Sequence, residues 1–230
     1  MNSLLPLRIV FFLRMILFNF LILFALRVVF YLKYAPEDFG IMNLKEIVWA
    51  FYLGGKFDLR LILLTMTPFL FFSKISFLDP LNREKGALFW TRFFVFTMGL
   101  ILVSYMVDFG TYSYLSARVN STLLKFLKNP LISLEMVWQS YPVLWILFGL
   151  LSFLFFYKFF LMQKVFSKRS SIEIGEKSWE KNLFLWFFVV VFWIGGIYGK
   201  FAYYPLRWSE AFFTKNSFVS YLSLNPVLFF

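Results

Sequence analysis

The chain of 230 residues contains no cysteine and no histidine. Without cysteine it has neither a disulfide framework nor a thiolate metal site. Without histidine it lacks the commonest metal ligand and the commonest proton carrier near neutral pH. These absences argue against most metal-dependent and histidine-based catalysis. We therefore expect no catalytic residue, no metal site and no cofactor within this chain.

Charged side chains are also scarce, at 15% of the residues, and they fall mainly between long apolar runs. That distribution is expected where lipid rather than water is the solvent. The net charge of +11 is basic, but no dense Lys/Arg patch accompanies a soluble fold. Orientation across a membrane and anionic lipid headgroups explain the excess better than a nucleic-acid partner does. We expect membrane lipids, and anionic phospholipid in particular, as partners.

Apolar surface is what the chain has in abundance: 61% of its residues are hydrophobic and its mean hydropathy is +0.75. Five runs approach the length needed to cross the roughly 30 Å hydrocarbon layer of a bilayer. We predict an all-α integral membrane protein with five transmembrane helices and two or three interfacial amphipathic helices. The predicted spans lie at about 9–31, 59–77, 89–108, 136–157 and 182–203.

The first run is interrupted by Arg14 and Arg27, and a cleaved signal peptide is the alternative interpretation. The run is longer than the core of a typical signal peptide, and no small-residue cleavage site follows it. An uncleaved helix whose arginines extend toward water is favoured.

Two segments have the pattern of helices that lie along the membrane surface. Apolar residues recur at helical spacing from Leu44 to Phe51, and we expect this helix to stop at Gly54-Gly55. The second segment runs from Arg118 to Glu135, ahead of the fourth span.

Lys and Arg are most concentrated between residues 158 and 181. Because cytoplasmic loops carry the excess of positive charge, this loop predicts a cytoplasmic N-terminus and an extracytoplasmic C-terminus. The aromatic segment 204–230 then lies outside, and it must cover its apolar surface on the membrane, on the other helices or on something further along the chain. A sequence that stops at Val227-Leu228-Phe229-Phe230 is more typical of a cut chain than of a completed one.

Several short segments occur in an order that carries a family resemblance. Gly-Gly-Lys-Phe-Asp stands at 54–58, Asp-Phe-Gly at 108–110 leads to Arg118, and Pro-Leu-Arg-Trp-Ser at 205–209 and Leu-Asn-Pro at 224–226 follow the last span. In this order, over essentially its whole length, the chain resembles the membrane domain of the lipoteichoic acid synthase-like sulfatase family, within the alkaline phosphatase superfamily.

The resemblance implies a protein of a bacterial-type inner membrane, followed by an extracellular sulfatase-like domain. In that domain a threonine nucleophile and a divalent metal transfer phosphoglycerol or a related headgroup from a lipid donor. None of this machinery can be assigned to a chain without histidine. Residues 1–203 are therefore expected to anchor, and to present a lipid substrate to, a catalytic domain that is absent here, with 204–230 leading to it in cis or facing it on a separate chain.

Four charged residues are candidates for contact with the lipid headgroup. Asp58 and Asp108 lie near predicted span ends, where carboxylates are costly unless paired. Asp58 has the simpler interpretation of a helix-dipole charge, and Asp108 that of a water-boundary residue or a partner of Arg92 or Arg118. Arg118 and Arg207 are predicted outside, where a guanidinium binds phosphate bidentately or anchors the interface.

Two other functions stay open. Asp58, Asp108 and Pro68 are features that a self-contained small transporter or flippase-like protein could use, although no internal repeat is visible. Gly195 and Gly199 form a small-xxx-small pair suited to close helix packing, as in a structural subunit of a membrane complex.

Overall fold

The computed structural model describes residues 7–36, 44–73, 75–80, 83–120, 128–165 and 179–229. Within these ranges the chain forms helices and connecting segments without a β-strand, so the predicted all-α class is confirmed. The long helices are α1 (Leu7–Tyr34), α2 (Leu44–Phe72), α3 (Glu84–Leu115), α5 (Val143–Phe160) and α6 (Trp179–Tyr198). The short elements are α4 (Pro130–Ser140), η3 (Leu161–Val165), η5 (Trp208–Ala211), α7 (Ser217–Ser223) and α8 (Pro226–Phe229).

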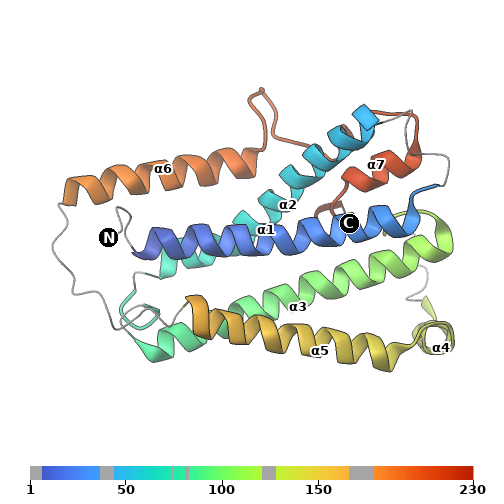
Figure 1. Ribbon diagram of the computed structural model, residues 1–230, viewed down its shortest axis with the longest axis horizontal. Helices are drawn as coiled ribbons and strands as arrows, with labels where there is room; N and C mark the ends of the chain where they lie inside the picture. The colour runs from blue at the N-terminus through green and yellow to red at the C-terminus, as the bar shows by residue number, and fades with distance from the viewer. Residues whose placement is uncertain are drawn as a thin grey trace.

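The five long helices run alternately in opposite directions along the long axis of the molecule (Figure 1). α2 packs against α1 and α6, and α3 packs against α5. α1, α3 and α6 begin at one end of the bundle, where α2 and α5 end. The juxtamembrane segment, residues 204–229, returns to the other end and packs there against α2 (Figure 1).

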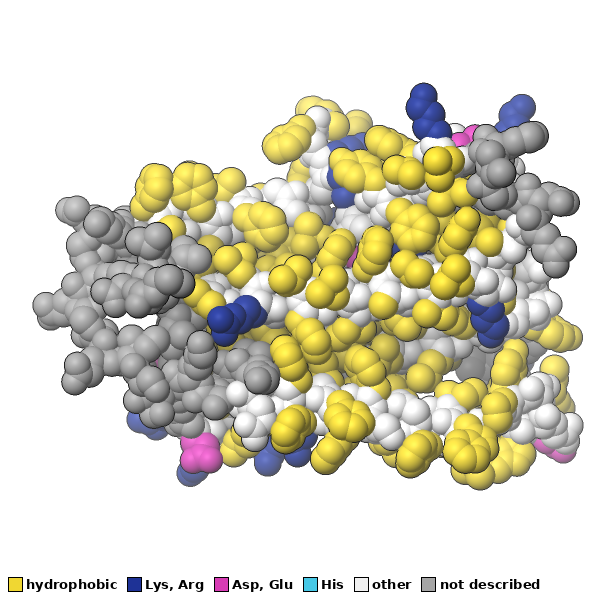
Figure 2. Space-filling model, viewed as in Figure 1, with side chains coloured by type: hydrophobic (Ala, Val, Ile, Leu, Met, Phe, Trp, Pro, Cys, Tyr) yellow, Lys and Arg dark blue, Asp and Glu magenta, His cyan; other side chains and the backbone are white. Residues whose placement is uncertain are grey.

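Three helical segments are long and apolar enough to cross a membrane, namely Ile9–Tyr34, Glu84–Leu115 and Val143–Gln163. Large apolar side chains face outward on them: Phe96 on α3 and Phe148 on α5 are each 66% exposed. Figure 2 shows hydrophobic side chains spread along the described helices of one face. Such a surface is compatible with a membrane protein. The five-span arrangement stays a prediction.

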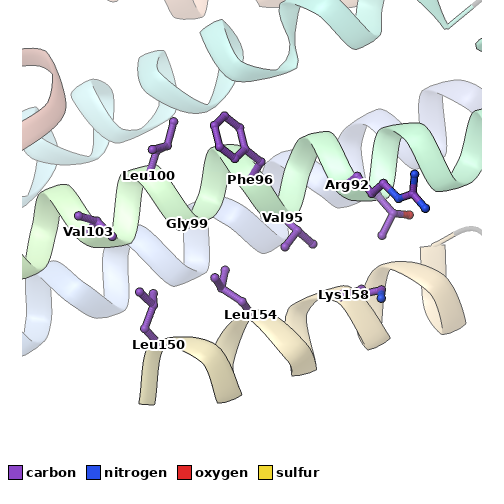
Figure 3. Close-up of a pocket in the computed structure, with 10 residues that line it drawn as sticks. Arg92, Val95, Phe96, Gly99, Leu100, Val103, Leu150, Leu154 and Lys158 are labelled. Atoms are coloured by element: carbon purple, nitrogen blue, oxygen red, sulfur yellow. The ribbon is translucent and has the colours of Figure 1, made fainter. Parts of the chain in front are cut away.

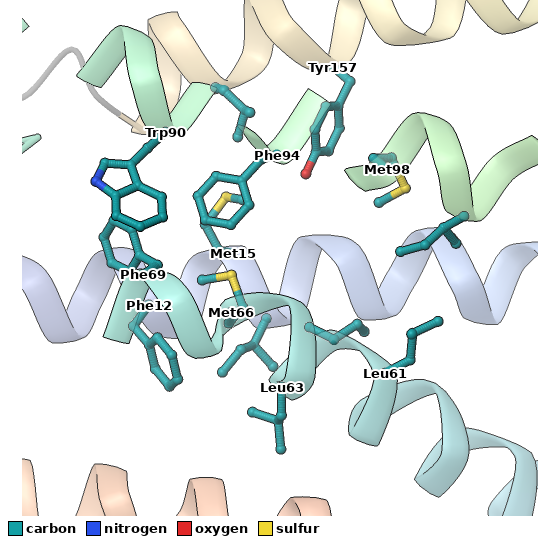
Figure 4. Close-up of a cluster of buried hydrophobic side chains, with 14 of the residues drawn as sticks. Phe12, Met15, Leu61, Leu63, Met66, Phe69, Trp90, Phe94, Met98 and Tyr157 are labelled. Atoms are coloured by element: carbon teal, nitrogen blue, oxygen red, sulfur yellow. The ribbon is translucent and has the colours of Figure 1, made fainter. Parts of the chain in front are cut away.

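The main core lies where α1, α2, α3 and α5 meet (Figure 4). A polar contact crosses it, since the Tyr157 hydroxyl donates to Asn19 Oδ1 at 2.9 Å and the Asn19 amide donates to the Met15 carbonyl at 2.8 Å. Hydrogen bonds of this kind hold helices together in an apolar environment. Around it pack large buried side chains, among them Phe12, Leu63, Met66, Phe69 and Trp90.

α2 continues without interruption through Gly54 and Gly55, so the prediction that a surface helix stops at this pair is wrong. The predicted amphipathic helix and the start of the second span belong to this one helix. A break between apolar neighbours would leave backbone N–H and C=O groups without partners, which costs more than the low helix propensity of glycine.

The predicted fourth span, 136–157, is divided at Tyr141 and Pro142. Tyr141 is extended, with φ −128° and ψ 146°, as expected for a residue that precedes proline. α4 is thus separate from α5 and is seen end-on in Figure 1. It overlaps the end of the second predicted surface helix, whose residues 121–127 lie outside the described ranges, as does most of the basic loop.

Candidate functional site

Arg27 of α1 and Asp58 of α2 form an ion pair in the protein interior. Their side chains are 1% and 0% exposed. Arg27 Nη2 lies 2.7 Å from Asp58 Oδ1, and Arg27 Nε donates to Asp58 Oδ2 at 3.1 Å. This is the bidentate geometry in which guanidinium and carboxylate bind most strongly.

Gly54 makes room for this pair. Its carbonyl accepts a hydrogen bond from Arg27 Nη2 at 3.1 Å. A Cβ atom at position 54 would fall inside van der Waals contact of the guanidinium. Glycine is therefore required here for the close approach of α2 to the Arg27 side chain, one turn before Asp58.

The juxtamembrane segment adds hydrogen bonds to both members of the Arg27–Asp58 pair. Asn225 Nδ2 donates to Asp58 Oδ1 at 2.8 Å and to the Tyr105 hydroxyl oxygen at 3.2 Å. The Tyr105 hydroxyl of α3 donates to the same Asp58 oxygen at 3.3 Å. Arg27 Nη1 donates to the carbonyl of Leu224 at 3.1 Å and also to that of Leu222. We call Arg27, Asp58, Tyr105 and Asn225 the Arg27 cluster.

A second ion pair joins Asp108 of α3 to Arg118 in the segment that follows this helix, and both side chains are at most 2% exposed. The backbone N–H of Val119 donates to Asp108 Oδ1 at 3.1 Å. The Arg118 guanidinium carbon lies 4.0 Å from the centre of the Phe30 ring, a cation–π arrangement. Asp108 and Arg118 form the Arg118 cluster, and their pairing was one of the alternatives raised by the sequence.

The two clusters meet at the C-terminal end of α7. Arg118 Nε donates to the Tyr221 carbonyl at 3.0 Å, and Arg27 donates to the carbonyl of the next residue, Leu222. The last carbonyls of a helix have no partner within the helix and carry partial negative charge. The two arginines therefore satisfy a helix end that is buried in the protein.

Three of the four predicted headgroup-contact residues face the protein interior. Asp58 and Asp108 are each 0% exposed and Arg118 is 2% exposed, so their polar atoms bind other parts of this chain. Arg207 is exposed on the surface, with its guanidinium carbon 4.5 Å from the centre of the Tyr204 ring. Contact with lipid stays a prediction for all four, and Arg207 is the one of them that the fold leaves accessible.

The glycines of α6 differ in their surroundings. A Cβ atom at Gly195 would have nothing within 4 Å, whereas one at Gly196 would fall on the Leu63 side chain of α2. Gly196 therefore makes the close contact between these helices. Gly199 has φ +79° and donates its N–H to the Gly195 carbonyl at 2.8 Å, which ends α6 with a left-handed residue.

Sequence reasoning missed Arg27, Tyr105 and Asn225 as members of the site. Arg27 was interpreted as a side chain that extends toward water. The signal that could have found the pair is energetic, because an arginine and an aspartate placed in apolar helices each need a partner. Their separation of 31 residues along the chain carries no motif.

The two clusters hold segments together through ion pairs and hydrogen bonds. Every buried side-chain polar atom of the described residues has a hydrogen-bond partner. Asp58 and Asp108, the acids that a transporter pathway would use, are both ion-paired. The transporter function also stays a prediction. Comparisons of the chain with protein-family models, with curated proteins and with solved structures found no match.

Proposed function

We propose that this chain is the membrane-anchoring and lipid-presenting domain of a lipoteichoic acid synthase-like phosphotransferase or sulfatase. It acts with an extracellular catalytic domain that is carried in the same polypeptide or on a separate chain. The divalent metal and the nucleophile belong to that domain. The membrane domain has its N-terminus in the cytoplasm of a bacterial-type cell and its residues 204–230 on the outer face.

One observation carries the proposal: the short segments that define the family resemblance converge in space. Segment 54–58 supplies Asp58, and segment 224–226 supplies Asn225, which binds it. Segment 108–110 begins with Asp108, which pairs with Arg118. These three segments are far apart in sequence, so their convergence on two adjoining clusters supports their serving one function rather than being three coincidences of composition.

The clusters also supply what an anchoring domain needs. They bind the juxtamembrane segment to α1, α2 and α3 through Arg27, Asp58 and Tyr105. Arg60 Nη1 of α2 adds a bond to the Leu206 carbonyl at 2.7 Å. A domain attached to or docked on this segment would therefore be held in a fixed relation to the helices.

Lipid presentation is supported by the surface around Arg207. Tyr203, Tyr204 and Trp208 are 88%, 54% and 56% exposed. Aromatic side chains of this kind favour the headgroup level of a bilayer, and an accessible guanidinium among them can bind a phosphate bidentately. We assign the headgroup of the anionic phospholipid donor to this surface.

The first test is the identity of the catalytic partner. The tagged protein is purified from native membranes and its associated polypeptides are identified by mass spectrometry, together with the reading frame that follows codon 230. We expect a sulfatase-like domain with a threonine nucleophile and a histidine-bearing metal site, either in frame or co-purified. Finding it in neither place would refute the proposal.

The second test addresses presentation of the lipid. Native membranes that carry Arg207→Ala are supplied with headgroup-labelled phosphatidylglycerol. We expect headgroup transfer to fall about tenfold, the loss of one strong charge-assisted contact. Lys215→Ala removes an exposed positive charge from the same segment and should leave transfer unchanged. Equal effects of the two variants would contradict the role of Arg207.

A further inference from the structure

A groove lies between α3 and α5, away from both clusters (Figure 3). Its volume is about 500 Å³, within the range of cavities that bind small molecules. Figure 3 shows the Arg92 and Lys158 side chains near one end of it. The rest of the lining is mainly apolar: Val95, Phe96, Leu100, Val103, Leu150 and Leu154.

The length of the groove matches one leaflet of a bilayer. Arg92 and Val103 are eleven positions apart on α3, which corresponds to roughly 16 Å along a helix axis. Half of the hydrocarbon thickness of a bilayer is about 15 Å. Gly99 stands midway along this row, where a Cβ atom would lie 3.4 Å from Leu154 Cδ1. The glycine therefore lets Leu154 lie against α3 at this point, and a larger side chain here would compete with Leu154 and with an occupant for the same space.

The charge of the groove is confined to one end. Arg92 and Lys158 are exposed, and neither forms an ion pair with any residue in the described part of the chain. They lie where α3 begins and α5 ends, at the end of the bundle opposite the juxtamembrane segment (Figure 1). Two cations beside an apolar groove complement an amphipathic molecule with an anionic head.

We infer that this groove binds an anionic phospholipid of the bilayer. One acyl chain lies along Val95, Gly99 and Leu154, and the phosphate binds the Arg92 guanidinium and the Lys158 ammonium group. The two positive charges favour an anionic lipid over other occupants. An apolar helix of another protein would gain no electrostatic attraction from them. The cationic group of a zwitterionic lipid would offset the attraction of its phosphate. This site lies in the leaflet opposite Arg207 and goes beyond the proposed function.

Native mass spectrometry of the purified full-length chain in detergent tests the inference, with phosphatidylglycerol and phosphatidylcholine as probes. We expect the unmodified protein to retain phosphatidylglycerol preferentially. The double variant Arg92→Gln/Lys158→Gln should lower that retention about tenfold, because it removes both positive charges that attract the anionic headgroup. The matched control Arg83→Gln/Lys85→Gln removes two exposed charges at the same end of α3 and should retain the lipid.

Gly99→Leu provides an independent variant, since it fills the groove and leaves both charges in place. Retention of phosphatidylglycerol should fall again. The inference is overturned if Arg92→Gln/Lys158→Gln retains this lipid as the unmodified protein does, if the control pair loses it equally, or if phosphatidylcholine is retained as well. The readout is lipid retention rather than headgroup transfer, so failure here and failure of the proposed function are distinguishable.

Discussion

At the scale of single residues, every N–H donor of the Arg27 guanidinium makes a hydrogen bond. Its Nε donates once and its Nη1 and Nη2 donate twice each, to the Asp58 carboxylate and to three backbone carbonyls. A guanidinium has five N–H donors, so none is left over. Lysine presents its donors from one atom and cannot reproduce this fork. Lysine therefore cannot reproduce the hydrogen bonds that Arg27 makes in this cluster.

Asp58→Ala should strongly destabilise the protein, because it leaves the Arg27 charge buried without its partner. Losing one member of a buried pair costs about 3–5 kcal/mol, which lowers the thermal unfolding midpoint in detergent by roughly 10 °C for a chain of this size. Arg27→Met/Asp58→Leu should be less destabilised than the sum of its single variants. Additive effects in this double-mutant cycle would contradict the pairing.

Gly54→Ala should also lower the unfolding midpoint, although alanine favours helix. The added methyl group meets the guanidinium, which can move away only by breaking its hydrogen bonds. Gly149→Ala is the matched control, since nothing lies within 4 Å of a Cβ atom there, and it should be neutral or stabilising by up to about 1 kcal/mol. Thermal unfolding of the two variants gives the comparison, and equal midpoints would argue against the close approach.

At the scale of elements, the helices could be predicted and their partners could not. An apolar run is a local property, so the helical character of α1, α3 and α5 follows directly from sequence. The continuity of α2 depends on what surrounds Gly54. The division of the fourth span depends on Pro142, whose effect an uncharged apolar run does not by itself reveal. The docking of the juxtamembrane segment on α2 includes the bond between Asn225 and Asp58, which are 167 positions apart, and one sequence contains no signal for such a contact.

Asn225→Ala should release the juxtamembrane segment while the long helices persist. Asn225 binds Asp58 and Tyr105, and its Oδ1 accepts from the N–H groups of Val227 and Leu228 at 3.0 and 3.3 Å. Without these bonds, we expect amide hydrogen exchange in α7 and α8 to accelerate about tenfold. Gln139→Ala on the exposed face of α4 is the control. Unchanged exchange in α7 would show that the docking does not depend on Asn225.

At the scale of the whole molecule, the apolar composition was sufficient to predict an all-helical fold with apolar helices compatible with a membrane protein. The number of spans was not settled by it, because α2 carries Lys56, Asp58 and Arg60 in its middle. These charges make α2 too polar to stand alone in lipid, yet Asp58 is neutralised by α1. Whether a helix is apolar enough to cross a membrane is thus a property of the assembly as well as of the helix.

The predicted orientation is testable because the chain has no cysteine. Single cysteines are introduced at Ser217, which is exposed at the start of α7, and at Ser170, in the basic segment outside the described residues. A membrane-impermeant maleimide should label Ser217→Cys in intact cells, and Ser170→Cys only after the membrane is opened. Labelling of both in intact cells would exclude an odd number of spans between them.

The contact between Asp58 and Asn225 can form only late in the synthesis of the chain. The two residues are 167 positions apart, which a ribosome covers in roughly 10 to 30 s at usual rates. During this interval α1 and α2 are already made, but Arg27 lacks the two carbonyls of residues 222 and 224. The Arg27 network is therefore completed only when the last part of the chain has been made, and a chain that stalls before residue 222 keeps the ion pair with Asp58 but leaves the two Nη1 donors of Arg27 without these partners.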